Sequence, residues 1–286
     1  MKIRRAGDLA APLALVALTL AFFWKLAFTN LILAGVDVFC YFYPYRAYAA
    51  QAIRQGHLPL WNPYLFMGVP FLANSQAGVL YPLNLALDCL SPARLVSWSI
   101  ILHVALAGVF AYLYARSSLR LSRWAALLAG MVFAGSGFLG AQVEHVNQLN
   151  ASAWLPLLLL LYDRAVRGWK GGRLEGWKGG GPAVLLGSLV VGVQFLAGHA
   201  QSSYICLVGL GVYALVSLGT EARQGFSTGH FREASEGIPR LRYAPLRMLV
   251  PAAIRCLGVL ALMTVLGLGL AAVQLVPTWE LSRLSV

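Results

Sequence analysis

Charged side chains are scarce in this sequence. They make up only 11% of the 286 residues, whereas hydrophobic residues make up 59% and the mean hydropathy is +0.70. A soluble globular domain normally carries about a quarter charged residues. The composition therefore excludes an ordinary soluble protein and predicts an all-α, polytopic membrane protein whose residues 1–286 form a single membrane domain.

Cysteine is also rare, with four residues at Cys40, Cys89, Cys206 and Cys256. No Cys-x-x-Cys pair and no cysteine–histidine spacing occurs, which argues against a structural zinc site. Cys40 and Cys89 fall in the same loop. They either form a disulfide, if that loop faces an oxidising compartment, or act as two small buried hydrophobic side chains.

Long apolar runs predict a bundle of about seven membrane-spanning helices. The predicted spans cover residues 9–28, 95–114, 124–140, 151–162 (extending towards 166), 183–197, 204–218 and 249–276. The first run is too long for a signal peptide and no small-residue cleavage site follows it closely, so we expect it to be retained. The glycine-rich segment with GWKGG at 168–172 and 176–180, and the arginine-rich segment after Leu218, read as hydrophilic connectors.

Basic residues fall mainly on one side of these spans. Of the 22 basic residues, only five fall on the other side. The seventeen on the basic side are Lys2, Arg4, Arg5, Arg116, Arg120, Arg123, Arg164, Arg167, Lys170, Arg173, Lys178, Arg223, Arg232, Arg240, Arg242, Arg247 and Arg255. By the positive-inside rule the N-terminus is cytoplasmic, and after seven spans the C-terminus lies outside. The net charge of +12 is thus a topology signal and not a sign of nucleic-acid binding.

The segment between the first two spans, residues 30–94, is a long extracytoplasmic loop. It contains six of the 13 prolines and many aromatic residues, so we expect it to be ordered and packed. Pro44 suits the first turn, and Gly56 the C-terminal end, of an amphipathic helix along the membrane surface. Residues 57–63 should be extended, and residues 83–90 should form another short helix.

Polar side chains gather in this loop and in the two short outer turns: Asp37, Arg46, Arg54, Glu144, His145, His199 and Gln201. Reversing the chain needs only a few polar residues, so the excess indicates a lined cavity. Each residue also has a simpler explanation. Asp37 would cap a helix, the two arginines would reach lipid phosphates, and the turn residues would be solvated or bonded at a helix end. His103, inside the second span, should be a satisfied interhelical donor.

Several motifs in the loop and beyond resemble those of the YfhO-type bacterial membrane proteins. They are Gly35-x-Asp37, Tyr43-Pro44-x-Arg46, Gly56-x-Leu58-Pro59-Leu60-Trp61-Asn62-Pro63, Gly68-x-Pro70, Tyr81-Pro82-Leu83-Asn84 and Gly198-His199-x-Gln201. That family is similar to the GT-C glycosyltransferases, which include the protein O-mannosyltransferases and the aminoarabinose transferases. Its members are usually much longer, so the resemblance implies an N-terminal part or a truncated member.

The resemblance implies a GT-C-like enzyme of the bacterial plasma membrane with its active face outside. It would transfer a sugar from a polyprenyl-phosphate donor to a cell-envelope acceptor. Asp37 matches the key acidic residue of the first outer loop and would be the general base. Arg46, Arg54 or His199 would stabilise the departing phosphate. Glu144, His145 and Gln201 would bind substrate, or the first two would hold a divalent metal with Asp37.

Two other functions remain open at this point. One is a non-catalytic membrane scaffold, and the other is a transporter or flippase for envelope lipids. A transport pathway normally needs ionisable groups near the middle of the membrane. Here only His103 occupies such a position, which argues against the transporter or flippase.

Overall fold

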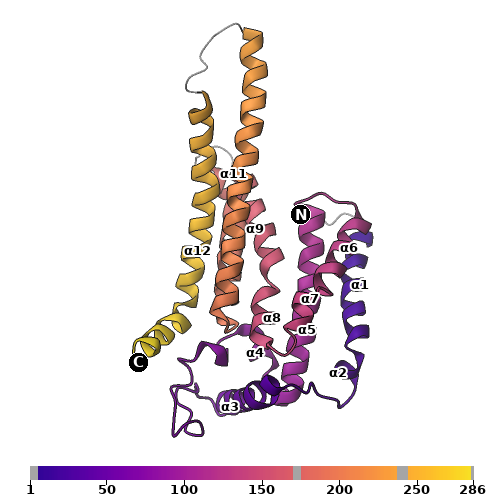
Figure 1. Ribbon diagram of the computed structural model, residues 1–286, viewed down its shortest axis with the longest axis vertical. Coiled ribbons are helices and arrows are strands. Elements are labelled where there is room, and N and C mark those ends of the chain that lie inside the picture. The colour runs from indigo at the N-terminus through magenta and orange to yellow at the C-terminus, as the bar shows by residue number, and fades with distance from the viewer. Residues whose placement is uncertain (1–5, 170–174, 237–243, 285–286) are drawn as a thin grey trace.

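The computed structural model describes residues 6–169, 175–236 and 244–284, with side chains for 9–169, 179–220 and 250–284. Within these residues the chain is all-helical, as predicted, and the only β-type pairing is a single bridge between Asn62 and Val69 (Figure 1). The basic residues Lys2, Arg4, Arg5, Lys170, Arg173, Arg240 and Arg242 lie outside the described part, as does most of the first GWKGG repeat.

Five helical segments are long and apolar enough to cross a membrane. They are α5 (Pro92–Ser117), α6 with α7 (Arg123–Ala134 and Gly137–Ala141), and segments of α10 (Glu175–Leu196), α11 (Ala200–Glu236) and α12 (Ala244–Leu284). The other two predicted spans are each divided: α1 (Ala6–Phe22) from α2 (Trp24–Phe28), and α8 (Val146–Ser152) from α9 (Leu155–Gly168). A crossing needs about 20 helical residues, so length and composition mark five candidate spans of a membrane protein.

Three predicted boundaries were wrong because helices continue further than the sequence pattern indicated. The second GWKGG repeat lies inside α10, and the segment after Leu218 extends α11 to Glu236. Propagating an existing helix adds one hydrogen bond per residue, so it tolerates poor helix formers that could not start one. Likewise α12 continues through Pro277 to Leu284. It bends towards its C-terminal end (Figure 1), as helices do where proline removes a hydrogen bond.

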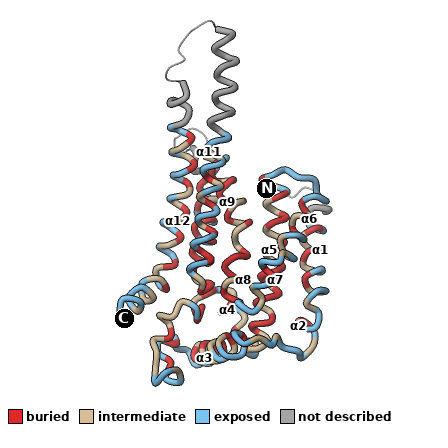
Figure 2. The backbone as a smooth tube through the Cα atoms, in the orientation of Figure 1, coloured by how far each residue is buried: buried red, intermediate tan, exposed pale blue. Residues whose placement is uncertain are grey.

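The helix α5 is the most central span, with 72% of its apolar window buried. Figure 2 shows buried residues concentrated along α5 and α9, and many exposed residues along α1 and α12. One core cluster joins α9, α10, α11 and α12 around Tyr162, Val191 and Met263. Another joins α5 to the outer loop through Phe42 and Ile100. The second cluster anchors the loop on the bundle.

A buried polar chain also ties the loop to the spans. The indole of Trp154 donates to the Tyr81 hydroxyl at 3.0 Å, and that hydroxyl donates to Nε2 of His103 at 2.5 Å. Because the Ser99 carbonyl only accepts, Nδ1 of His103 must donate to it, at 2.6 Å. Both ring nitrogens of His103 therefore have hydrogen-bond partners, as predicted. However, the bond that His103 donates stays within α5, and the bond that reaches another segment is accepted from Tyr81 of the loop. His103 is thus not the interhelical donor that was predicted.

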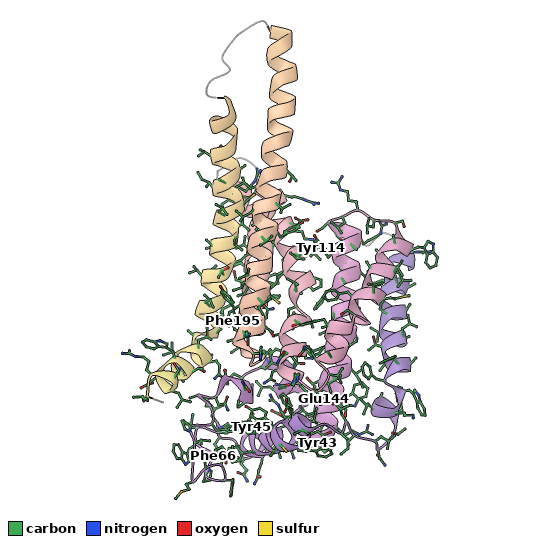
Figure 3. The ribbon with its side chains drawn as sticks, viewed as in Figure 1. Tyr43, Tyr45, Phe66, Tyr114, Glu144 and Phe195 are labelled. Carbon is green, nitrogen blue, oxygen red and sulfur yellow. The ribbon has the colours of Figure 1, made fainter. Side chains whose placement is uncertain are left out.

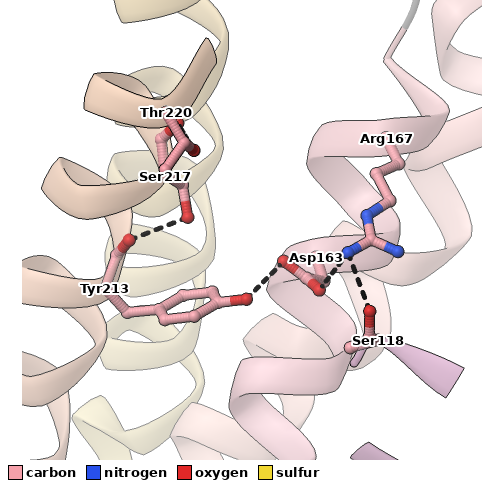
Figure 4. A network of polar contacts seen from close by, with 6 residues as sticks. All are labelled: Ser118, Asp163, Arg167, Tyr213, Ser217 and Thr220. Carbon is pink, nitrogen blue, oxygen red and sulfur yellow. Dashed lines mark hydrogen bonds and ion pairs between the residues drawn. The ribbon is translucent and has the colours of Figure 1, made fainter. Parts of the chain in front are cut away.

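Polar contacts hold the opposite end of the bundle together (Figure 4). The Tyr213 hydroxyl donates to one carboxylate oxygen of Asp163 at 2.8 Å, and Arg167 donates to the other at 2.9 Å. Arg167 also donates to the Ser118 carbonyl at 3.1 Å. Since Asp163 is only 7% exposed, its charge requires such partners. The network joins α9 to α11 and to the end of α5.

The outer loop begins with a helix that lies across the ends of the spans (Figure 1). A π-helical turn, η1 (Val38–Phe42), leads into α3 (Tyr43–Arg54), which has Pro44 in its first turn. Gly56 follows with φ of +79°, as predicted for the end of this helix. Residues 58–61 form neither helix nor strand, and α4 (Pro82–Leu87) forms the second predicted short helix. Cys40 and Cys89 are both exposed, with free thiols, and are not the buried pair that one alternative required.

Candidate functional site

Three segments that are far apart in the sequence meet at the loop end of the molecule. The side-chain amide of Asn147, on α8, donates to the carbonyl of Gln76 in the outer loop at 2.6 Å. Gly198, in the turn between α10 and α11, has φ of +92°, and a Cβ there would lie 2.6 Å from the carbonyl oxygen of Ser75. Only glycine permits both this backbone conformation and this close approach. Figure 3 shows Tyr43, Tyr45, Phe66 and Glu144 gathered at this end.

A polar cavity of about 220 Å³, which we call the reaction cavity, lies where these segments meet. Its lining residues are Asp37, Tyr41, Phe42, Gln76, His145, Asn147, Gln148 and His199. The structure thus brings together Asp37, His145 and His199, three of the residues proposed from the sequence. Asp37 directly precedes η1, His145 directly precedes α8, and His199 directly precedes α11. Because these positions are far apart in the sequence, no local pattern connects them.

Asp37 and His145 form a direct pair within this cavity. Nδ1 of His145 lies 2.8 Å from Oδ2 of Asp37, and the two side chains are 46% and 50% exposed. Asp37 stands at the N-terminal end of η1 but makes no capping hydrogen bond, so the simple capping explanation does not hold. The carboxylate accepts from Nδ1, and this leaves Nε2 of His145 and Oδ1 of Asp37 available to a substrate.

His199 has two roles in the structure. Its Nδ1 accepts a hydrogen bond from the backbone N–H of Ser202 at 3.0 Å, which caps α11, and its ring also lines the reaction cavity. Burial lowers the pKa of His199 below its ordinary value, and the neighbouring His145 lowers it further. The neutral ring, unprotonated at Nδ1, carries its proton on Nε2. His199 can therefore donate a hydrogen bond from Nε2 without carrying a charge.

We predict that His199 makes the stability of the protein depend on pH. The lowered folded-state pKa means that the unfolded chain binds more protons than the folded chain as the pH falls through about 6.5. The contribution of His199 to stability is therefore present above that pH and lost below it. His199→Asn keeps a capping acceptor but does not titrate. The fall in unfolding temperature in detergent between about pH 7.5 and about pH 5 should be smaller in this variant, and an equal fall would contradict the prediction.

Tyr41 and Phe42 also line the reaction cavity and were not among the residues predicted from the sequence. Residues four apart share one face of an α-helix, and the π-helical turn brings the fifth residue to that face as well. Asp37, Tyr41 and Phe42 follow this spacing, which was the available signal. The Tyr41 hydroxyl accepts from the side-chain amide of Asn74 at 3.2 Å. Burial raises the pKa of Tyr41, so its hydroxyl stays protonated.

The two arginines do not line the reaction cavity. Arg46 is buried, with 4% exposure, and donates to the carbonyl of Gly78 at 3.1 Å. Burial lowers its pKa to about 10, while Asp88 and Tyr41 act in the opposite direction. Arg54 donates to the carbonyls of Asp88 and Leu90, each at 3.2 Å. Both arginines therefore support the backbone of the loop, and neither is placed to hold a departing phosphate in this cavity.

Glu144 and Gln201 are not part of the lining of the reaction cavity. The Glu144 carboxylate covers Gly35, where an added Cβ would come within 2.9 Å of Oε2. Gln201 is exposed in the first turn of α11. Among the described residues, no group of three His, Cys, Asp or Glu side chains could hold a metal ion. The set Asp37, Glu144 and His145 thus lacks the arrangement that the metal alternative required.

An apolar groove of about 580 Å³ opens on the bundle between α1, α5, α6 and α7. It is lined by Leu15, Leu18, Thr19, Phe22, Phe23, Val104, Met131, Ala134, Gly135, Ser136, Leu139, Gly140 and Val143. Its lining includes Val143, which stands two residues before His145 in the sequence. Leu18 and Phe22 are exposed, so hydrocarbon chains of the bilayer have access to the groove.

Comparisons of the chain with models of protein families, with curated proteins and with solved structures found no match.

Proposed function

We propose that the protein is a GT-C-type membrane glycosyltransferase, which moves a hexose from a polyprenyl-phosphate lipid to an acceptor of the cell envelope. The observation that carries the proposal is one polar cavity that contains the Asp37–His145 pair and His199. A carboxylate–imidazole pair in a cavity is suited to accepting a proton. The resemblance of the loop motifs to those of YfhO-type proteins supports the same activity.

In the proposed reaction an acceptor hydroxyl attacks the anomeric carbon of the lipid-linked sugar. A new carbon–oxygen bond forms, the bond between the anomeric carbon and the phosphate oxygen breaks, and the lipid phosphate leaves with the electron pair. Asp37 accepts the hydroxyl proton as general base, and His145 holds the carboxylate through Nδ1. His199 donates from Nε2 to the phosphate oxygen on which charge develops.

The apolar groove supports a lipid-linked donor. Its lining is mostly apolar, its residues Leu18 and Phe22 are exposed, and Val143, two residues before His145 in the sequence, is part of it. A chain in the groove would place its phosphate near the reaction cavity. The described arginines at the opposite end of the bundle, such as Arg116, Arg120 and Arg123, favour an extracytoplasmic reaction cavity in a bacterial plasma membrane.

A non-catalytic scaffold is the second candidate. It is favoured by exposed apolar side chains in the outer loop, namely Leu60, Trp61, Tyr64, Phe66 and Met67. Exposed apolar surface of this kind marks interaction sites. A scaffold gives no reason for a pair of ionisable groups inside a cavity, so the transferase accounts for more of the structure.

The test is sugar transfer from a radiolabelled pool of polyprenyl-phosphate sugars in membranes that contain the wild type or Asp37→Asn. The substitution keeps the shape of residue 37 and removes its basicity. Transfer by the wild type that is lost in the folded, inserted variant supports the proposal. Equal transfer by both removes Asp37 from the mechanism. Transfer by neither contradicts the enzyme hypothesis for this chain and favours the scaffold.

A further inference from the structure

A second cavity, of about 460 Å³, adjoins Gln76, which also lines the reaction cavity. One wall comes from the outer loop and the other from the C-terminal part of α12. Bonds from α12 hold these walls together: Gln274 donates to the carbonyl of Leu72 at 2.7 Å, and Thr278 donates to that of Ala73 at 2.8 Å. The cavity is therefore formed by a defined contact between two distant segments.

Gln76 lines both cavities. Its backbone is held at both ends, because its N–H donates to the Asn74 side chain at 3.1 Å and its carbonyl accepts from Asn147 at 2.6 Å. Its side-chain amide is exposed and bonds to no described residue. A fixed backbone with an uncommitted amide is suited to binding a polar ligand that extends from one cavity to the other.

The chemistry of the second cavity differs from that of the first. Its aromatic surface consists of Tyr45, which stacks on Tyr41 at a ring distance of 3.9 Å, and Phe66. Its polar groups are the amides and hydroxyls of residues such as Gln76 and Ser282, and none of its lining residues carries a charge. Flat aromatic faces beside neutral hydrogen-bonding groups match a sugar ring, which has apolar C–H faces and hydroxyl edges.

We propose that the second cavity binds a neutral, hydroxyl-rich glycan, with Tyr45 and Phe66 against the sugar rings and Gln76 at the passage to the reaction cavity. Naming this glycan as the acceptor of transfer rests on the proposed function. Binding of the glycan does not depend on transfer, so each can fail without the other. An anionic polymer is disfavoured, because no cation lines the cavity to offset its charge.

Phe66 and Met67 provide a matched pair of variants. They are neighbours, they are 91% and 101% exposed, and both have positive φ, of 47° and 66°. Only Phe66 lines the second cavity. Because neither side chain supports the core, Phe66→Ala and Met67→Ala should both fold, which thermal unfolding in nanodiscs can verify. A difference in glycan binding between them would then reflect the cavity.

Calorimetric titration of the full chain in nanodiscs with maltotriose and with triacetylchitotriose tests the proposal, with an oligogalacturonate of similar length as the anionic comparison. We expect saturable binding of at least one neutral probe, weakened roughly three- to tenfold by Phe66→Ala and changed less than about twofold by Met67→Ala. Binding of neither neutral probe, equal losses in both variants, or tighter binding of oligogalacturonate would each overturn it. Binding as expected in a chain without transfer activity would leave the glycan site in place and reject only its role as acceptor site.

Discussion

Replacing either member of the Asp37–His145 pair should lower sugar transfer by about 100- to 10,000-fold, the range associated with a lost acid–base group. Asp37→Asn removes the proton acceptor. His145→Ala removes the group that holds the carboxylate at 2.8 Å, so the remaining carboxylate can rotate away from the substrate. Initial rates at saturating donor, in membranes with matched amounts of inserted protein, measure both effects.

The double variant distinguishes one catalytic unit from two independent residues. If Asp37 and His145 act together, the double variant should be about as slow as the slower single variant, because groups that act as a unit are not additive. Multiplied losses would indicate separate roles and contradict the pairing. His57→Ala is the matched control, because His57 is an exposed histidine of the same loop that does not line the reaction cavity. It should retain wild-type transfer.

Arg46→Met should destabilise the protein by about 3 kcal/mol, since it removes a buried charged hydrogen-bond donor and leaves Asp88 buried with less compensation. Arg46 is buried and donates to Gly78, while Asp88 is 5% exposed with Oδ1 unpartnered among the described residues. Burial raises the pKa of Asp88, whereas the charges of Arg46 and, to a smaller extent, Arg54 lower it. Thermal unfolding in detergent measures the loss.

Two further variants test this explanation. Arg54→Met is the control, because Arg54 is exposed and its bonds to two carbonyls should contribute less. Gly78→Ala should also destabilise the loop, because φ at Gly78 is +51° and a Cβ would lie 2.7 Å from Nη2 of Arg46. In the Arg46→Met background the cost of Gly78→Ala should be smaller, since the guanidinium is gone. Equal costs in both backgrounds would show that the close contact does not contribute.

Local features of the fold were predictable from the sequence, and features that depend on distant partners were not. Pro44 and Gly56 correctly marked the helix in the outer loop, because proline and glycine restrict the backbone at their own positions. The predicted span 249–276 stopped just before Pro277, but α12 continues through this proline and bends. The sequence patterns of Arg46 and Arg54 did not reveal that their partners are backbone carbonyls of the loop.

The sequence by itself determined that this is an all-α membrane protein with an ordered loop between its first two apolar segments and polar residues concentrated in that loop and two turns. These properties follow from composition and from local backbone preferences. Only the tertiary structure decided that Asp37 faces His145, that Asn147 holds Gln76, and that Glu144 covers Gly35. The physical reason is that such contacts join residues that are far apart in the sequence through packing of whole helices, and no periodicity in the chain encodes which turn meets which loop.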